Sequence, residues 1–72
     1  MEQHTISDYE KWQHELKSRR KELRLPQWKI AKYVKISNGT YSTIETGRRK
    51  ATPRIQSRIE KVLQHYGSPG HH

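Results

Sequence analysis

Small uncharged side chains that can donate and accept hydrogen bonds follow one another in the segment after Ser37. At helical spacing, Tyr41 and Ile44 point to one side of this segment and leave the polar side chains on the other. A helix face without charges is unusual in a chain with a net charge of +8. Donors and acceptors of this size suit the edges of bases in a DNA major groove. The candidates for such readout are Asn38, Thr40, Ser42 and Thr43.

Asn38 is the strongest of these candidates. Its amide can bind adenine N6 and N7 together, which is worth about 1–3 kcal/mol of discrimination. The alternative is that Asn38 is a second capping residue beside Ser37. Ser42 and Thr43 are divided between base and phosphate contacts. Gly39 either lets the backbone approach DNA closely or is tolerated near a helix end, where glycine costs roughly 0.5–1 kcal/mol.

Positive charge dominates the chain after its first quarter. Residues 1–16 carry four acidic residues and one lysine, whereas residues 17–72 carry fourteen lysines and arginines and three glutamates. This asymmetry predicts a polyanion as partner, and a basic surface kept for solubility is the simpler alternative. A basic loop with one arginine after it is expected to contact phosphates or a minor groove, or else to be solvated. These cations are Arg48, Arg49, Lys50 and Arg54.

Composition argues against several other kinds of site. The chain has no cysteine, so it has no disulfide framework and no thiolate zinc site. Its histidines show no metal-ligand spacing, and we expect no metal and no cofactor. No nucleophile stands beside a base and no glycine-rich loop could hold phosphate, so an enzyme is not expected. No apolar run approaches the roughly 18–20 residues of a membrane span, so we expect no membrane contact. The expected location is the cytoplasm, in association with the nucleoid.

Four helices are expected to position these residues. Ser7 and Glu10 form a capping-box pattern, which predicts a helix from about Asp8 to Arg24. Pro26 pushes the residue before it out of the α region and can begin a second helix, Gln27–Val34. Ser37 is the expected N-cap of the third helix. Gly47 is expected to end it.

Thr52 and Pro53 read as the N-cap and first position of a fourth helix that runs to about Tyr66. One domain, residues 7–66, is therefore expected. Residues 1–6 are expected to form a flexible tail and residues 67–72 a disordered one, whose final His pair is typical of an affinity tag.

The segment Gln27–Glu45 resembles the helix-turn-helix of the Cro/CI-type (XRE-like) DNA-binding domains of bacteria and phages. The resemblance runs from about Leu16 to Leu63 and implies an all-α, lambda-repressor-like domain of four helices, or five. Its matching features are Gln27, Ile30-Ala31, Val34, Ile36-Ser37, Tyr41, Ile44, Glu45 and Gly47.

Three positions depart from this family pattern. Pro26 stands where Ser or Thr often caps the second helix. Lys35 stands where Gly is common because the backbone there tends to positive φ, which costs a residue with a side chain on the order of 1 kcal/mol or more. Gly39 removes a side chain from a position that resembles a base-contacting one in the family.

The resemblance also implies roles for individual residues. Arg20 and Glu45 match an ion pair, which is either shielded and orienting or exposed and weak. Gln27 matches a residue that holds a phosphate oxygen, and its alternative is a solvent-exposed side chain. Together with the candidates given above, the expected base contacts are Asn38, Gly39, Thr40, Ser42 and Thr43. Lys35 has general electrostatic attraction as its alternative. The full set of expected backbone contacts is Gln27, Lys35, Ser37, Tyr41, Arg48, Arg49, Lys50 and Arg54.

The partner expected from this pattern is double-stranded DNA. The resemblance implies a bacterial or phage regulator, often a repressor, with weak homodimers or cooperative pairing on DNA as alternatives to a monomer. Trp28 and Tyr33 lie off the apolar face of the second helix, where they either contact a protein partner or pack against helix ends. The rival hypothesis is an adaptor, anti-repressor or antitoxin that keeps the fold without reading DNA.

Overall fold

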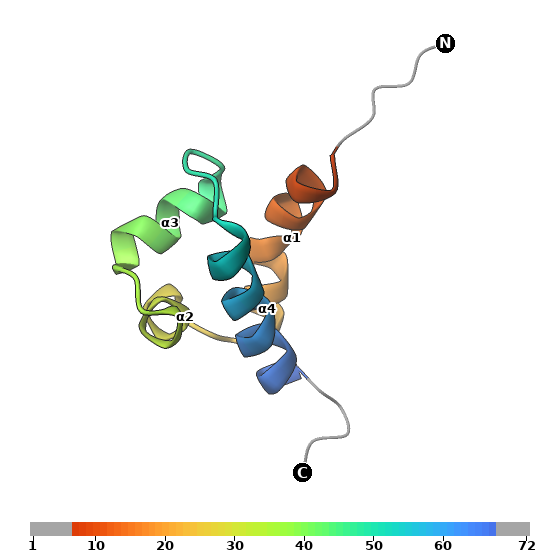
Figure 1. The fold of residues 1–72 in the computed structure, drawn as a ribbon. Coiled ribbons are helices and arrows are strands. Elements are labelled where there is room, and N and C mark those ends of the chain that lie inside the picture. Colours follow the sequence, from red (N-terminus) through yellow and green to blue (C-terminus); the bar gives the residue numbers. More distant parts are fainter. Residues whose placement is uncertain (1–6, 68–72) are drawn as a thin grey trace.

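The computed structural model describes residues 7–67, which form four helices. These are α1 (Asp8–Glu22), α2 (Gln27–Val34), α3 (Asn38–Thr46) and α4 (Pro53–Gly67). Figure 1 shows α2 and α3 on one side of the molecule and α1 with α4 on the other. The all-α expectation is confirmed, and no fifth helix lies within residues 7–67. The two expected tails, apart from Gly67, lie outside the described residues.

Local sequence signals begin each helix. Ser7 and Glu10 form the expected capping box at α1. Pro26 precedes α2 with no side-chain cap, and the Ser37 hydroxyl accepts a hydrogen bond from the Thr40 backbone N–H at α3. Thr52 Oγ1 accepts from the Ile55 backbone N–H at the start of α4. Capping chemistry therefore fixes where α1, α3 and α4 begin.

Each of the first three helices is followed, within two residues, by a residue in the left-handed region. These residues are Arg24 (φ 57°), Lys35 (φ 68°) and Gly47 (φ 86°). In each case the next residue's N–H reaches back to an earlier carbonyl, as from Leu25 to Arg20 at 3.2 Å. The structure therefore ends α1 at Glu22 rather than near Arg24, because Arg24 has already left the helical conformation.

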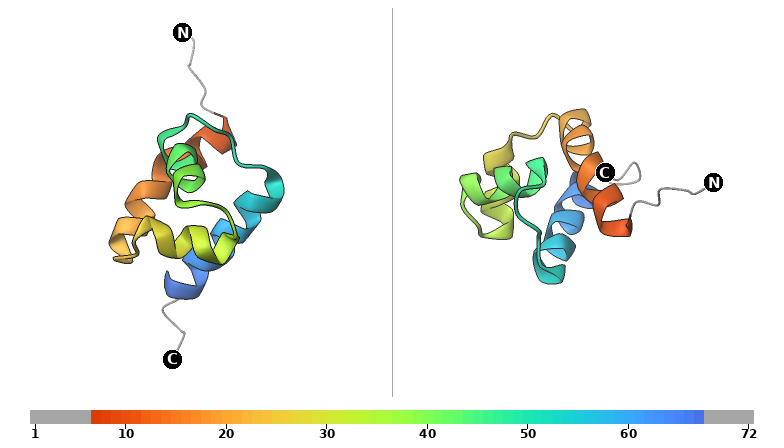
Figure 2. Two further views of the ribbon diagram at one scale, coloured as in Figure 1. Left: turned by 90° about the vertical axis from the view of Figure 1, so that its left-hand side faces the viewer. Right: turned by 90° about the horizontal axis from the view of Figure 1, so that it is seen from above.

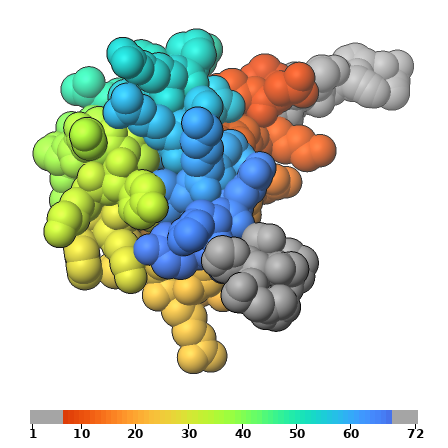
Figure 3. Space-filling model, turned by 60° about the horizontal axis from the view of Figure 1, so that its bottom comes forward, coloured from red at the N-terminus to blue at the C-terminus, as the bar shows by residue number. Residues whose placement is uncertain are grey.

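One apolar core joins all four helices. Side chains of α1, α2, α3 and α4 meet there, and Leu25 and Ala51 extend it into the connecting segments. Figure 3 shows α4 lying against α2 on one face of the molecule. The buried members are Leu16, Leu25, Ile30, Ala31, Val34, Tyr41, Ile44, Ala51, Ile59, Val62 and Leu63. This packing fixes α2 and α3 relative to each other and leaves one side of α3 outside the core.

Candidate nucleic-acid interface

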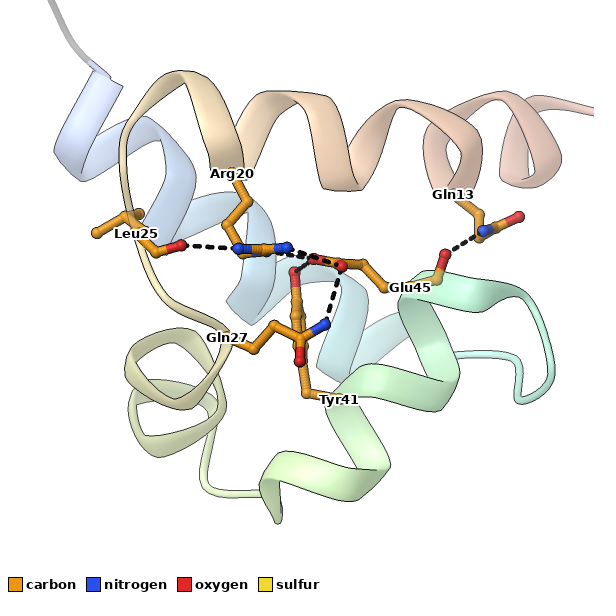
Figure 4. A network of polar contacts seen from close by, with 6 residues as sticks. All are labelled: Gln13, Arg20, Leu25, Gln27, Tyr41 and Glu45. Atoms are coloured by element: carbon orange, nitrogen blue, oxygen red, sulfur yellow. Dashed lines mark hydrogen bonds and ion pairs between the residues drawn. The ribbon is translucent and has the colours of Figure 1, made fainter.

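A buried carboxylate holds α3 in place. Glu45, near the end of α3, accepts hydrogen bonds from Arg20 Nε at 2.6 Å, Tyr41 Oη at 2.8 Å and Gln27 Nε2 at 3.0 Å (Figure 4). Arg20 also donates through Nη1 to the Leu25 carbonyl oxygen at 2.9 Å. The predicted ion pair of Arg20 and Glu45 is present, with side chains only 11% and 2% exposed. Together, the hydrogen bonds of Glu45 and Arg20 connect α1, the α1–α2 connection and α2 to α3.

These contacts set the charge state of the network. Burial alone would raise the pKa of Glu45, but hydrogen bonds from Arg20, Tyr41 and Gln27 outweigh it and lower that pKa below its usual value. Burial, with the hydrogen bond to Glu45, raises the pKa of Tyr41. Glu45 is therefore ionised and Tyr41 is a neutral donor at physiological pH.

Tyr41 was expected to contact the DNA backbone, and that expectation is corrected. Its side chain is 0% exposed and its hydroxyl donates to Glu45 inside the protein. A phenol enclosed in the core cannot reach a phosphate. The Gln27 residue is half-buried and donates one amide hydrogen to Glu45, so the alternative of a solvent-exposed side chain is not seen.

A second ion pair joins α1 to α4. The Arg19 guanidinium pairs with the Glu60 carboxylate, which also accepts from Trp12 Nε1 at 2.7 Å. The hydrogen bond from Arg19 lowers the pKa of Glu60. This pair was not predicted from the sequence, because its two members lie forty-one positions apart in the chain. Trp12 itself was the available signal in the sequence, because an indole N–H at a core position needs an acceptor.

The outward side of α3 carries the candidate base contacts. Asn38 and Gly39 are exposed, and Thr40, Ser42 and Thr43 are half-buried. Ser37 rather than Asn38 provides the N-cap, so the alternative role of Asn38 as a capping residue is not seen. Thr46, which was not among the predicted contacts, is also exposed and uncharged.

Two of these hydroxyls also serve the helix itself. The Ser37 hydroxyl donates to Thr40 Oγ1 at 2.8 Å, and Thr43 Oγ1 donates to the Thr40 carbonyl oxygen at 2.7 Å. Thr40 is thus part of the cap at the start of α3. Asn38 and Ser42 have the freer polar groups for another molecule.

Exposed cations stand at both ends of α3. Lys35 precedes the helix, and the loop that follows it carries Arg48, Arg49 and Lys50, all exposed. Arg54, in the first turn of α4, is exposed as well. Figure 2 (left) turns α2 and α3 toward the viewer, with the α3–α4 loop beside them. An uncharged surface between positive ends is the result.

Arg58 has a different role from these cations. Its guanidinium donates to the Val34 carbonyl oxygen at 3.4 Å, at the C-terminal end of α2. A cation there complements the partial negative charge of the helix end. Arg58 therefore supports the turn that leads into α3.

Trp28 and Tyr33 are each 56% exposed on α2. Any packing of these two residues against helix ends therefore covers less than half of the surface of each.

Within residues 7–67, no cluster of His, Asp and Glu could hold a metal ion. Over that same part of the chain, no helix is both long and apolar enough to cross a membrane.

Comparison with known families identifies the arrangement. A family model described as helix-turn-helix matches residues 16–66, which include α2, the turn and α3. Searches among curated proteins and among solved structures found no match. The match covers most of the chain and agrees with the four helices of residues 7–67 and with the Cro/CI-type resemblance. The chain belongs to the XRE/Cro-CI-like helix-turn-helix family of DNA-binding regulators.

Proposed function

We propose that this protein is a sequence-specific transcriptional regulator that places α3 in the major groove of double-stranded DNA, with α2 crossing the backbone above it. One observation carries the proposal: the outward side of α3 is uncharged, is held rigidly by the Glu45 network, and lies between cations at both ends. In such an arrangement, backbone contacts set affinity and register, and base contacts set specificity.

The proposed base contacts come from the outward side of α3. Asn38 and Ser42 are the main readers, because their polar groups are the least engaged inside the protein. Thr43 and Thr40 contribute through the remaining capacity of hydroxyls that already serve the helix. Exposed Gly39 lets the backbone approach the bases closely.

The proposed phosphate contacts surround this surface. Gln27 keeps one amide hydrogen free of Glu45 and stands at the N-terminus of α2, where an anion is favoured. Each cation that neutralises a phosphate should add about 0.9 to the slope of log affinity against log salt. The proposed backbone contacts are Gln27, Lys35, Ser37, Arg48, Arg49, Lys50 and Arg54.

A repressor of bacterial or phage origin that pairs weakly, or only on DNA, is the form of regulator we favour. The family resemblance supports it. Sedimentation with and without DNA tests the pairing: a stable dimer in the free protein would contradict it.

A gel shift at two salt concentrations, with competitor DNA, tests the function itself. We expect salt-sensitive binding that prefers a site selected from a random DNA pool. Binding that is salt-sensitive but blind to sequence would instead indicate an architectural role.

The exposed aromatic side chains of Trp28 and Tyr33 favour a second candidate, a protein-interaction adaptor. No DNA binding in the gel shift, at either salt concentration, would support the adaptor over the regulator.

A further inference from the structure

The first two turns of α1 contact the basic loop that carries Arg48, Arg49 and Lys50. These two turns lie outside the residues that match the family. The match begins at residue 16, whereas α1 begins at Asp8. Tyr9 and Gln13, on these two turns, reach residues around the α3–α4 loop. The family comparison therefore leaves the role of this segment unexplained.

Tyr9 holds the second half of the loop. Its phenol oxygen accepts a hydrogen bond from the Ala51 backbone N–H at 2.8 Å. The Lys50 ammonium lies 5.0 Å from the centre of the same ring, within range of a cation–π contact. One side chain thus fixes both the backbone and a cation of the loop.

Gln13 holds the beginning of the loop. Its Nε2 donates to the Glu45 backbone carbonyl at 2.5 Å, at the last turn of α3 (Figure 4). Its side chain also lies against Gly47, where an added Cβ would come within 3.2 Å of Gln13 Oε1. Gln13 of α1 therefore adds a tertiary contact to the end of α3, which the backbone bonds of Gly47 and Arg48 also fix.

The contacts of Tyr9 and Gln13 with the outer side of the loop are mainly polar. An open pocket lies between the two segments, lined by polar groups that include Ser7, Glu10 and Thr46. On that side the hydrogen bonds and the cation–π contact add to the hold that the loop already has from buried Ala51 and from the Arg48 and Arg49 N–H groups bound to the Thr43 carbonyl. A loop that is ordered before binding loses less conformational entropy when it meets DNA.

We infer that the first two turns of α1 are a brace that fixes the basic loop for phosphate contact, with Tyr9 and Gln13 as its positioning residues. The inference rests on the proposed function, in which Arg48, Arg49 and Lys50 contact the DNA backbone. Tyr9 and Gln13 act through these loop residues and need not touch DNA themselves.

The test compares Tyr9→Phe and Tyr9→Leu with the wild-type protein. Tyr9→Phe removes only the acceptor of the Ala51 N–H, and Tyr9→Leu also removes the ring beneath Lys50. Tyr66→Leu is the matched control, because Lys29 lies 5.3 Å from the Tyr66 ring, away from the loop. Affinity is measured by fluorescence anisotropy on a site selected by the wild-type protein, at a temperature where every variant is folded.

We expect Tyr9→Phe to bind about two- to tenfold more weakly, with unchanged sequence preference and faster hydrogen exchange at the Ala51 amide. Tyr9→Leu should bind more weakly still and lower the salt slope by up to about 0.9, the share of one phosphate contact. Tyr66→Leu should change neither quantity. A merely structural Tyr9 would lower the melting temperature without changing the affinity of the folded variants.

Two failures are distinguishable. If the wild-type protein binds its site and both Tyr9 variants bind equally well, the brace is wrong and the proposed function stands. If the wild-type protein binds no DNA, the proposed function is wrong and the role of the brace in binding falls with it.

Discussion

At the scale of single residues, Glu45 is the group on which the position of α3 most depends. Its carboxylate is nearly inaccessible to solvent and is satisfied by donors from α1, α2 and α3 itself. A buried charge with this many partners is tolerated only while they all remain, because each lost donor leaves part of the charge uncompensated.

Arg20→Met should therefore be strongly destabilising. We expect a loss of about 3–5 kcal/mol in the free energy of unfolding, because Glu45 would stay buried without its cation. Arg19→Met is the control, since the Arg19–Glu60 pair is 34% and 28% exposed and should be worth only about 0–1 kcal/mol. Urea unfolding of both variants measures the difference.

A domain of this size has roughly 4–11 kcal/mol of stability, so Arg20→Met can be partly unfolded. The double variant Arg20→Met/Glu45→Gln should then be more stable than Arg20→Met, because no charge is left buried. Equal stability of Arg20→Met and the wild-type protein would contradict the role given to the pair.

Acid should destabilise the protein through the same carboxylate. The pKa of Glu45 is lower in the folded protein than the ordinary value of 4.5, so the unfolded chain binds more protons in acid. Stability is present above pH 4.5 and is lost as pH falls through the folded pKa. The pKa of Glu60 is also lowered, by its hydrogen bond from Arg19. Circular dichroism in urea between pH 7 and pH 2 should show a shallower acid loss in Glu45→Gln than in the wild-type protein.

Lys35 carries backbone strain that glycine would relieve. Its φ of 68° and ψ of 45° lie in the left-handed region, which costs a residue with a Cβ about 1 kcal/mol. Lys35→Gly should raise stability by about 0.5–1 kcal/mol, whereas Lys35→Ala removes the same charge and keeps the strain. Thermal unfolding separates the two variants; a Lys35→Ala protein as stable as Lys35→Gly would contradict the strain. Both should lower the salt slope of DNA binding alike.

At the scale of elements, the helix starts could be predicted because their signals are local. Ser7 with Glu10, Ser37, and Thr52 with Pro53 each mark a helix start within four residues of sequence. The end of α1 was predicted less well, because the left-handed residue that follows it is Arg24 and not the glycine that usually marks this conformation.

Contacts between elements were mostly beyond sequence reasoning. The hydrogen bond from the Ala51 N–H to Tyr9 joins residues forty-two positions apart, and no local sequence pattern predicts it. The Arg20–Glu45 pair was found only through the family resemblance. The roles of Tyr41 were partly misassigned, since spacing placed its ring inward and could not show that its hydroxyl is used there too.

Gly39→Ala tests how α3 uses its first turn. A Cβ at Gly39 would meet no atom within 4 Å, so the change should stabilise α3 by about 0.5–1 kcal/mol. If the backbone at Gly39 approaches DNA closely, the same methyl group should weaken specific binding. Melting temperature and affinity would then move in opposite directions. A more stable variant with unchanged affinity would mean that Gly39 is merely tolerated.

At the scale of the whole molecule, the exposed cations and the uncharged hydrogen-bonding groups of α3 occupy different parts of the surface. The first turn of α1 carries Asp8 and Glu10, whereas exposed cations flank α3. On this division, loss of a flanking cation should weaken binding to every DNA sequence alike, and loss of a polar group on α3 should weaken the preferred sequence most.

The most direct test of the account is the sequence preference of the triple variant Asn38→Ala/Ser42→Ala/Thr43→Ala, which spares the capping residue Thr40. Affinity for a site selected from a random DNA pool and for an unrelated sequence is measured for this variant and the wild-type protein, at matched salt concentrations. We predict that the wild-type protein prefers the selected site, and that the variant binds both DNAs equally with a nearly unchanged salt slope. A folded variant that keeps the wild-type preference would contradict the assignment of α3 as the surface that reads DNA.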